Sequence, residues 1–377
     1  MTHDDRPAWI QREALLLAPY AMSAAATAGR VHPEPAHSYR NPYQRDRDRI
    51  VHSSAFRRLA HTTQVFTGEM GDYHRSRLTH TLEVASIART VARTLRLNED
   101  LAEALALAHD MGHPPFGHAG EDVLDDCLAD HGGFNHNRQG LRIVELLERR
   151  YPEFPGLNLS LEVLDGQRTR AEKSRSDSHA PAPLLECQAV DAADSVAYDA
   201  HDADDAVELG LLELGALEEI ELWRQAGRRA RARYAALDEP QFRRAAVHEL
   251  IDLLVGDLLS MSAKRIDEAD FADVDDVRVR GAGAVGLSAE LAQQKAALEK
   301  LLFAQVYRHP VVVEQRTHAG DALREMFSFY AARPERLPTR LDVVATTEGA
   351  PRAAADFLAG LTDRGALEEA RQLRAGG

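Results

Sequence analysis

The stretch HDMGHPPFGHAGE, residues 109–121, decides how the chain is interpreted. It begins where an apolar helical pattern ends, because the two prolines after His113 lack the N–H group that a helical hydrogen-bond ladder needs. A second helical pattern opens at His118 and continues through residue 128. The sequence therefore predicts a sharp corner between two helices, with several histidines gathered at the corner.

Helical periodicity dominates the chain on both sides of this corner. Apolar residues recur three and four positions apart over residues 78–97, and a polar break separates this run from a second one over residues 101–111. Other helical runs are predicted over residues 43–59, 186–214, 245–261 and 287–306. Only short pieces, such as residues 274–279, carry the β-branched pattern of a strand. The sequence therefore predicts an all-α protein.

Composition divides the chain into three parts. Residues 1–40 contain scattered Pro and Ala and are predicted as an N-terminal arm, residues 41–215 as the domain around the histidine-rich corner, and residues 216–377 as a C-terminal helical region. Inside the central domain, residues 166–183 are rich in charge, Ser and Pro and contain almost no large apolar side chain. This composition predicts a mobile loop.

Charge and cysteine content argue against several classes of protein. The 377 residues carry a formal net charge of −15, which disfavours broad binding to a nucleic-acid backbone or an anionic membrane. A polyanionic substrate therefore needs a local cationic pocket, and the arginine-rich run over residues 224–233 is better interpreted as a solvated helix face. Two cysteines without a CxxC pair favour a reducing, cytoplasmic setting. No apolar run reaches the length of a membrane span.

Histidines and carboxylates concentrate around the corner in a pattern suited to metal binding. Nine of the 17 histidines lie within residues 52–136. His80 follows Arg77 by three positions on one predicted helix, and the pair His109 and Asp110 ends the next helix. Two imidazoles and two carboxylates make a mixed N and O set that suits Mn, Fe, Co or Mg better than a closed structural zinc site. We therefore expect a divalent metal ion here.

Two aspartates on the predicted helix over residues 186–214 compete as the fourth ligand. Asp194 is preferred to Asp191 because it places Tyr198 and Asp202 four and eight positions further on, along one face of the helix. Nearby, Asp199, Asp204 and Asp205 are interpreted as solvated carboxylates on a helix face. His52 and His61 are interpreted as surface or hydrogen-bonded structural residues.

Longer motifs carry a family resemblance. Besides the stretch over residues 109–121, these are FRRLAHTTQVF at residues 56–66, FNHNRQGLRIV at residues 134–144 and DAADSVAYDAHDADDA at residues 191–206. Together they resemble the deoxyguanosine-triphosphate triphosphohydrolase family of HD-domain metal phosphohydrolases. The resemblance covers roughly residues 40–215 and implies an all-α HD phosphohydrolase domain. Outside it, fragments such as YRHPVVV at residues 307–313 indicate no chemical role.

The resemblance also implies roles for individual residues, matched motif by motif. It implies the metal ligands His80, His109, Asp110 and Asp194. It implies phosphate contacts from Arg77 and His113, proton transfer by His118 with Glu121 orienting it, and His136 facing the triphosphate. It implies that Tyr198 and Asp202 hold the sugar, with Asp202 accepting a hydrogen bond from the 3′-hydroxyl.

Elementary chemistry agrees with two of these roles. His118 and Glu121 are three positions apart on a predicted helix, so the carboxylate can fix the tautomer of the imidazole and raise its basicity. Arg77 carries a permanent charge and a fork of N–H donors that suits phosphate oxygens.

The activity implied is metal-dependent hydrolysis of dGTP or another deoxynucleoside triphosphate (dNTP) to the deoxynucleoside and inorganic triphosphate. Two alternatives stay open: an HD-type 5′-nucleotidase or phosphodiesterase, and a nucleotide-sensing or single-stranded nucleic-acid-binding module. We expect a homo-oligomer without membrane association, for which single-stranded DNA is a further partner to test.

Overall fold

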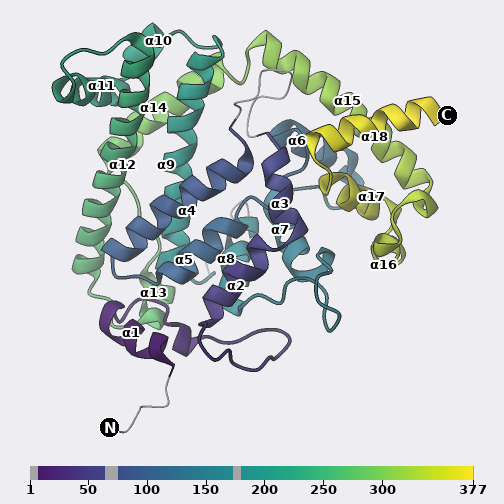
Figure 1. Ribbon diagram of the computed structural model, residues 1–377, viewed down its shortest axis with the longest axis horizontal. Helices are drawn as coiled ribbons and strands as arrows, with labels where there is room; N and C mark the ends of the chain where they lie inside the picture. Colours follow the sequence, from purple (N-terminus) through teal and green to yellow (C-terminus); the bar gives the residue numbers. More distant parts are fainter. Residues whose placement is uncertain (1–6, 64–74, 173–179, 377) are drawn as a thin grey trace.

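The protein is helical throughout the described residues of the computed structural model, which are 7–63, 75–172 and 180–376. Within these ranges the only β pairings are three isolated bridges, so the all-α prediction is confirmed. Figure 1 shows the helices α1 (Ala8–Leu16), α2 (Pro42–Val51), α3 (Ser54–Arg58), α4 (Arg77–Thr94), α5 (Glu99–Ala108), α6 (Gly117–Cys127), α7 (His136–Arg142), α8 (Leu161–Glu172), α9 (Leu185–Glu208), α10 (Leu214–Glu218), α11 (Glu221–Arg233), α12 (Glu239–Ala269), α13 (Val274–Arg280), α14 (Ala289–Gln305), α15 (Pro310–Ala332), α16 (Asp342–Thr347), α17 (Ala350–Ala359) and α18 (Asp363–Gly376).

Three helices, α4, α5 and α9, pack against one another at the centre of the molecule. Ser76 caps α4 by accepting a hydrogen bond from the Thr79 N–H, and Asn98 caps α5 in the same way through Leu101. Many of the buried residues on these helices are alanines, which let the helix backbones approach closely. The start of α4, the end of α5 and the middle of α9 therefore meet in one place.

Three hydrophobic cores support this meeting point from different sides. The first core lies around α2, α4, α5, α8 and the first half of α9. The second core joins the second half of α9 to α11, α12 and α14. The third core joins α6 to α15, α17 and α18, which lie on the side of the molecule opposite α11 and α12 in Figure 1. The C-terminal helices thus contribute to all three cores, because the second half of α12 and α13 pack into the first.

One local prediction from the sequence is wrong in part, and one short β-branched stretch is helical. Residues 166–172 belong to α8 instead of a loop, because the charged side chains of this segment form ion pairs within the protein and Gly166 packs against Leu105. Residues 173–179 of that predicted loop lie outside the described residues. Residues 274–279 form α13, where Asp273 caps the first turn and basic side chains occupy the last.

Two further expectations can be compared with the structure. The arginines of residues 224–233 lie on α11, with exposed side chains in ion pairs to neighbouring glutamates, as a solvated helix face requires. Among the described helices, none combines the length and the apolar character that crossing a bilayer requires.

Candidate active site

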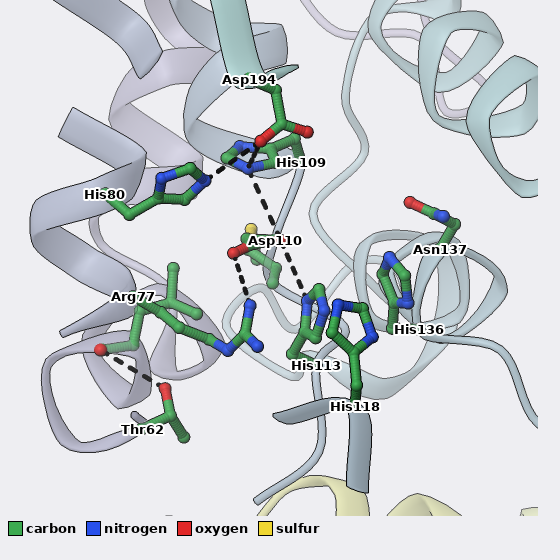
Figure 2. A network of polar contacts seen from close by, with 12 residues as sticks. Thr62, Arg77, His80, His109, Asp110, His113, His118, His136, Asn137 and Asp194 are labelled. Atoms are coloured by element: carbon green, nitrogen blue, oxygen red, sulfur yellow. Dashed lines mark hydrogen bonds and ion pairs between the residues drawn. The ribbon is translucent and has the colours of Figure 1, made fainter. Parts of the chain in front are cut away.

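The four predicted metal ligands come together where α4, α5 and α9 meet (Figure 2). His80 Nε2 lies 3.1 Å from Asp194 Oδ1, on the neighbouring helix. His109 Nε2 lies 3.6 Å from the same Asp194 oxygen and 3.5 Å from Asp110 Oδ1. Ligand atoms of His80, His109 and Asp194 therefore lie within 4.8 Å of one another, and Asp110 lies beside this group through its contact with His109, which gives the mixed N and O set of a metal site.

The orientation of His109 prepares one of its nitrogens for a metal ion. His109 Nδ1 donates a hydrogen bond to the Ala106 carbonyl at 2.6 Å, so Nε2 is left with its lone pair. This Nε2 is buried and forms no hydrogen bond within the described part of the chain. Burial lowers the pKa of His109, which favours the neutral form that binds metals. These residues fit a divalent cation, which would satisfy the His109 nitrogen and neutralise charge on the carboxylates beside it.

Asp110 connects the metal ligands to the side chains predicted to contact phosphate. Its Oδ2 accepts a hydrogen bond from Arg77 Nη1 at 2.8 Å, and its Oδ1 lies 3.0 Å from His113 Nδ1. Burial opposes ionisation of this carboxyl, but its neighbours His113, His109 and Arg77 together hold its pKa well below the ordinary value. Asp110 is therefore ionised at neutral pH.

Arg170 is a site residue that the sequence analysis missed, because it lies in the segment interpreted as a loop. Its guanidinium donates to Asp191 Oδ1 and to Asp194 Oδ2, both at 2.7 Å. The structure therefore separates the two competing aspartates: Asp194 contacts both histidines, whereas Asp191 contacts Arg170. The signal available in the sequence was the three apolar residues of LEVL at residues 161–164, which start α8 just before the charged segment.

The remaining histidines form a second group around Glu121. The Nδ1 atoms of His118 and His136 lie 3.1 and 2.8 Å from Glu121 Oε2, and the His113 ring stacks on the His136 ring with centroids 3.9 Å apart. Burial opposes ionisation of Glu121, but hydrogen bonds from His118 and His136 hold its pKa well below the ordinary value. The four ligand atoms lie within 4.8 Å of one another, so this second group also has the composition of a metal site.

Gly112 allows these two groups to lie close together. A Cβ atom at position 112 would lie 2.0 Å from the His136 carbonyl oxygen and 2.2 Å from the Gly140 nitrogen, both of which are backbone atoms of α7. The corner between α5 and α6 can therefore contact the start of α7 only where residue 112 has no side chain.

Replacing Gly112 by alanine is expected to lower kcat at least tenfold, because the added methyl group must displace α7 and move His136 away from Glu121. Steady-state kinetics would measure the change. Gly256→Ala is the matched control: that glycine lies within α12 with open space around its Cβ position, so activity should persist and stability should rise slightly. An unchanged kcat in Gly112→Ala would show that the placement of His136 does not limit the reaction.

A cavity of about 300 Å³ joins the two groups and extends beyond them. Its further lining includes Arg170, Ser195, Tyr198, Asp199, Lys295 and Glu299. The interpretation of Asp199 as a solvated carboxylate is wrong, because it is 1% exposed and forms an ion pair with Lys295 at 2.5 Å. Burial raises its pKa to about 6. Lys295 and Glu299 come from α14, which has no motif that points to the site.

The two residues predicted to hold a sugar differ in their access to this cavity. Tyr198 lines it, whereas Asp202 is 1% exposed and does not. Asp202 accepts a hydrogen bond from the hydroxyl of Tyr307, and the rings of Tyr198 and Tyr307 are 6.5 Å apart. Burial raises the pKa of Asp202 to about 7. Tyr307 opens the fragment YRHPVVV, which indicated no role in the sequence.

Outside the site, His52 and His61 are exposed, in agreement with their interpretation as surface residues. Asp204 and Asp205 form ion pairs with Arg243 and Arg75, respectively, so neither is simply solvated.

Comparisons with known proteins extend the similarity beyond the central domain. The model of the HD domain matches residues 77–199, and that of the phosphohydrolase-associated domain matches residues 285–372. A deoxyguanosinetriphosphate triphosphohydrolase-like protein of Azoarcus sp. (strain BH72) is 44% identical over 375 residues, which cover 97% of this chain and 98% of the relative. Proteins of the same description from Ralstonia pickettii (strain 12J) and Geobacter sulfurreducens are 42% and 40% identical, each over 95% of this chain and 94% of the relative.

Proposed function

This chain belongs to the deoxyguanosinetriphosphate triphosphohydrolase-like family, and we propose that it hydrolyses a dNTP to the deoxynucleoside and inorganic triphosphate. Its HD domain and its relatives make it a metal-dependent phosphohydrolase. The observation that supports the narrower proposal is the cavity, whose lining combines His80, Asp110 and Asp194 with Arg77, three further imidazoles and Tyr198.

The metal group accounts for the dependence on a cation. His80, His109, Asp110 and Asp194 would hold a divalent ion, for which Mn, Mg, Fe and Co are suitable, and the ion would make water a better nucleophile and stabilise charge on a phosphoryl oxygen. Three cationic side chains of the cavity, Arg77, Arg170 and Lys295, are each paired with a carboxylate of the protein. Binding of the triphosphate therefore also depends on the charge of the cation.

Proton transfer is assigned to the second group. Water attacks the α-phosphorus, the bond from phosphorus to the 5′-oxygen breaks, and the departing oxygen takes a proton from His118. Because His118 Nδ1 faces Glu121, its Nε2 is the nitrogen that can face the leaving group. His136 contacts the same carboxylate and His113 stacks on His136, so both can face the phosphates from the same side.

Tyr198, in the lining of the cavity, supports a preference for deoxyribose. We place the sugar against Tyr198, where a 2′-hydroxyl would collide with the ring or be buried without a partner, at a cost of roughly 1 to 3 kcal/mol. Asp202 is buried and does not line the cavity, so a hydrogen bond to the 3′-hydroxyl requires the neighbouring Tyr198 or Tyr307 side chain to move aside when the substrate binds.

The test is product analysis by ion exchange after incubation with Mn(II) and dGTP, GTP or 2′,3′-dideoxy-GTP. We expect intact triphosphate from dGTP, at least tenfold lower kcat/KM for GTP, poor turnover of the dideoxy analogue, and a smaller gap between dGTP and GTP in Tyr198→Ala. A parallel incubation with dGMP covers the alternative. Release of orthophosphate from dGMP, with the triphosphates left intact, would instead identify a 5′-nucleotidase. Equal kcat/KM for GTP and dGTP would contradict the sugar assignment but not the metal site.

A separate comparison tests Asp202. If it binds the 3′-hydroxyl, Asp202→Asn should lower kcat/KM for dGTP and have little effect on the residual turnover of 2′,3′-dideoxy-GTP. An equal loss for both nucleotides would show that Asp202 acts by holding Tyr307.

A further inference from the structure

The first residue of the C-terminal helix α18, Asp363, contacts two segments that are far from it in sequence. Its Oδ1 accepts a hydrogen bond from the backbone N–H of Phe116 at 3.0 Å. Its Oδ2 accepts two hydrogen bonds from Thr63, one from the backbone N–H at 3.0 Å and one from the hydroxyl at 2.6 Å. One carboxylate thus joins the end of the chain to the segment that precedes α6.

Phe116 is the residue at which this contact matters most. It directly precedes α6, and its φ of 66° and ψ of 19° lie in the left-handed region that a bulky side chain rarely adopts. No side chain caps α6 at this position. Such a conformation persists only when surrounding groups hold it, and Asp363 supplies the acceptor for the Phe116 N–H. His118 lies two residues further on, in the first turn of α6.

The other end of the same short segment is held by Arg58. Its guanidinium donates to the carbonyl oxygens of His113 at 2.7 Å and Met111 at 2.8 Å, and also to that of Leu361 at 3.4 Å. Residues 113–116 are therefore held at both ends: Arg58, which also contacts Leu361, holds His113, and Asp363 holds Phe116. The two prolines between these ends have no N–H with which to anchor the segment themselves.

We propose that Asp363 is a positioning residue for proton transfer: it fixes the start of α6, so that His118 faces the cavity and stays in contact with Glu121. This inference rests on the proposed role of His118. Asp363 touches neither the metal group nor the cavity lining, so it acts on the reaction only through α6.

Removing the carboxylate should lower kcat without lowering metal content. Asp363→Ala leaves the Phe116 N–H without its acceptor, and a displacement of a proton-transferring group by about 1 Å can cost on the order of 10²-fold in rate. We expect a loss of 10- to 100-fold in kcat, with bound Mn unchanged. Asp363→Asn can still present one oxygen to Phe116, so it should retain more activity than the alanine variant.

A double-mutant cycle with His118→Ala separates positioning from general damage to the fold. If Asp363 acts through His118, Asp363→Ala should change kcat less than twofold in the His118→Ala protein. The same 10- to 100-fold loss in both backgrounds would overturn the proposal. If His118→Ala alone left kcat unchanged, the assigned proton donor would be wrong, which is a distinguishable failure of the proposed function.

Hydrogen exchange supplies a readout that does not depend on activity. Amides of residues 116–121 should exchange faster in Asp363→Ala than in the unmodified protein. Glu369→Gln is the matched control, because Glu369 lies on the same helix and contacts Tyr330 instead of α6. Equal exchange of residues 116–121 in Asp363→Ala and the unmodified protein would also overturn the proposal. If the alanine variant fails to fold, Asp363→Asn and Thr63→Val allow the same comparisons.

Discussion

Replacing His109 or Asp110 by alanine is expected to abolish turnover and to lower the amount of bound metal. His109 Nε2 is buried, is fixed by the hydrogen bond from Nδ1 to Ala106, and lies between two carboxylates. Without the His109 imidazole, the site lacks the neutral nitrogen that lies between Asp110 and Asp194. A four-residue site that loses one ligand should bind the ion much more weakly, and the loss of rate should exceed 10³-fold.

Asp110→Ala should have an additional effect, because this carboxylate also contacts Arg77 and lies beside His113. Metal content after dialysis, measured by mass spectrometry, and turnover of dGTP in the presence of Mn(II) check both variants. His52→Ala is the control, since that histidine is exposed outside the site and should change neither quantity. Either variant with unchanged metal content and rate would refute the metal site.

Replacing His118 by alanine is expected to lower kcat by a factor of about 10² to 10⁴, the usual cost of a lost general acid, while the metal remains bound. The histidine lies in the second group, and its contact with Glu121 leaves one ring nitrogen free for the leaving oxygen. Glu121→Gln should cost less, because it changes the orientation and basicity of the imidazole but does not remove it.

The informative measurement is kcat together with metal content in the same preparation. His113, His118, Glu121 and His136 have ligand atoms close enough to hold an ion of their own. If His118→Ala lost metal and kept its residual rate, the second group would be a metal site and the division between metal ligands and proton donor would be wrong.

Local sequence patterns predicted the parts of the site that depend on local structure. The caps and apolar spacing of α4 and α5 are readable over a few residues, and these helices end or begin at the predicted ligands. The family motifs added Asp194, on α9, and the histidines around Glu121. All four predicted metal ligands therefore lie together, although their role as ligands stays a prediction.

The residues that the sequence analysis missed all depend on partners that are distant in the sequence. Arg170, Tyr307 and Asp363 reach the site through partners 24, 105 and 247 positions away, respectively. Hydrophobic periodicity describes neighbours on one helix and cannot show which distant side chains will meet. Composition misled for the same reason: the charged segment containing Arg170 looks solvated unless its ion-pair partners on α9 are known.

The arrangement of the three cores has a consequence for how such an enzyme can diverge. The predicted metal ligands lie on helices of the first core. Tyr198 lies on the half of α9 that belongs to the second core, and α6, which carries His118, belongs to the third. A substitution inside one core mainly disturbs the part of the cavity that this core supports. If the proposed roles hold, we expect substitutions in α11 and α14 to alter the choice of nucleotide, and substitutions in α15, α17 and α18 to alter the rate, with little effect on metal binding.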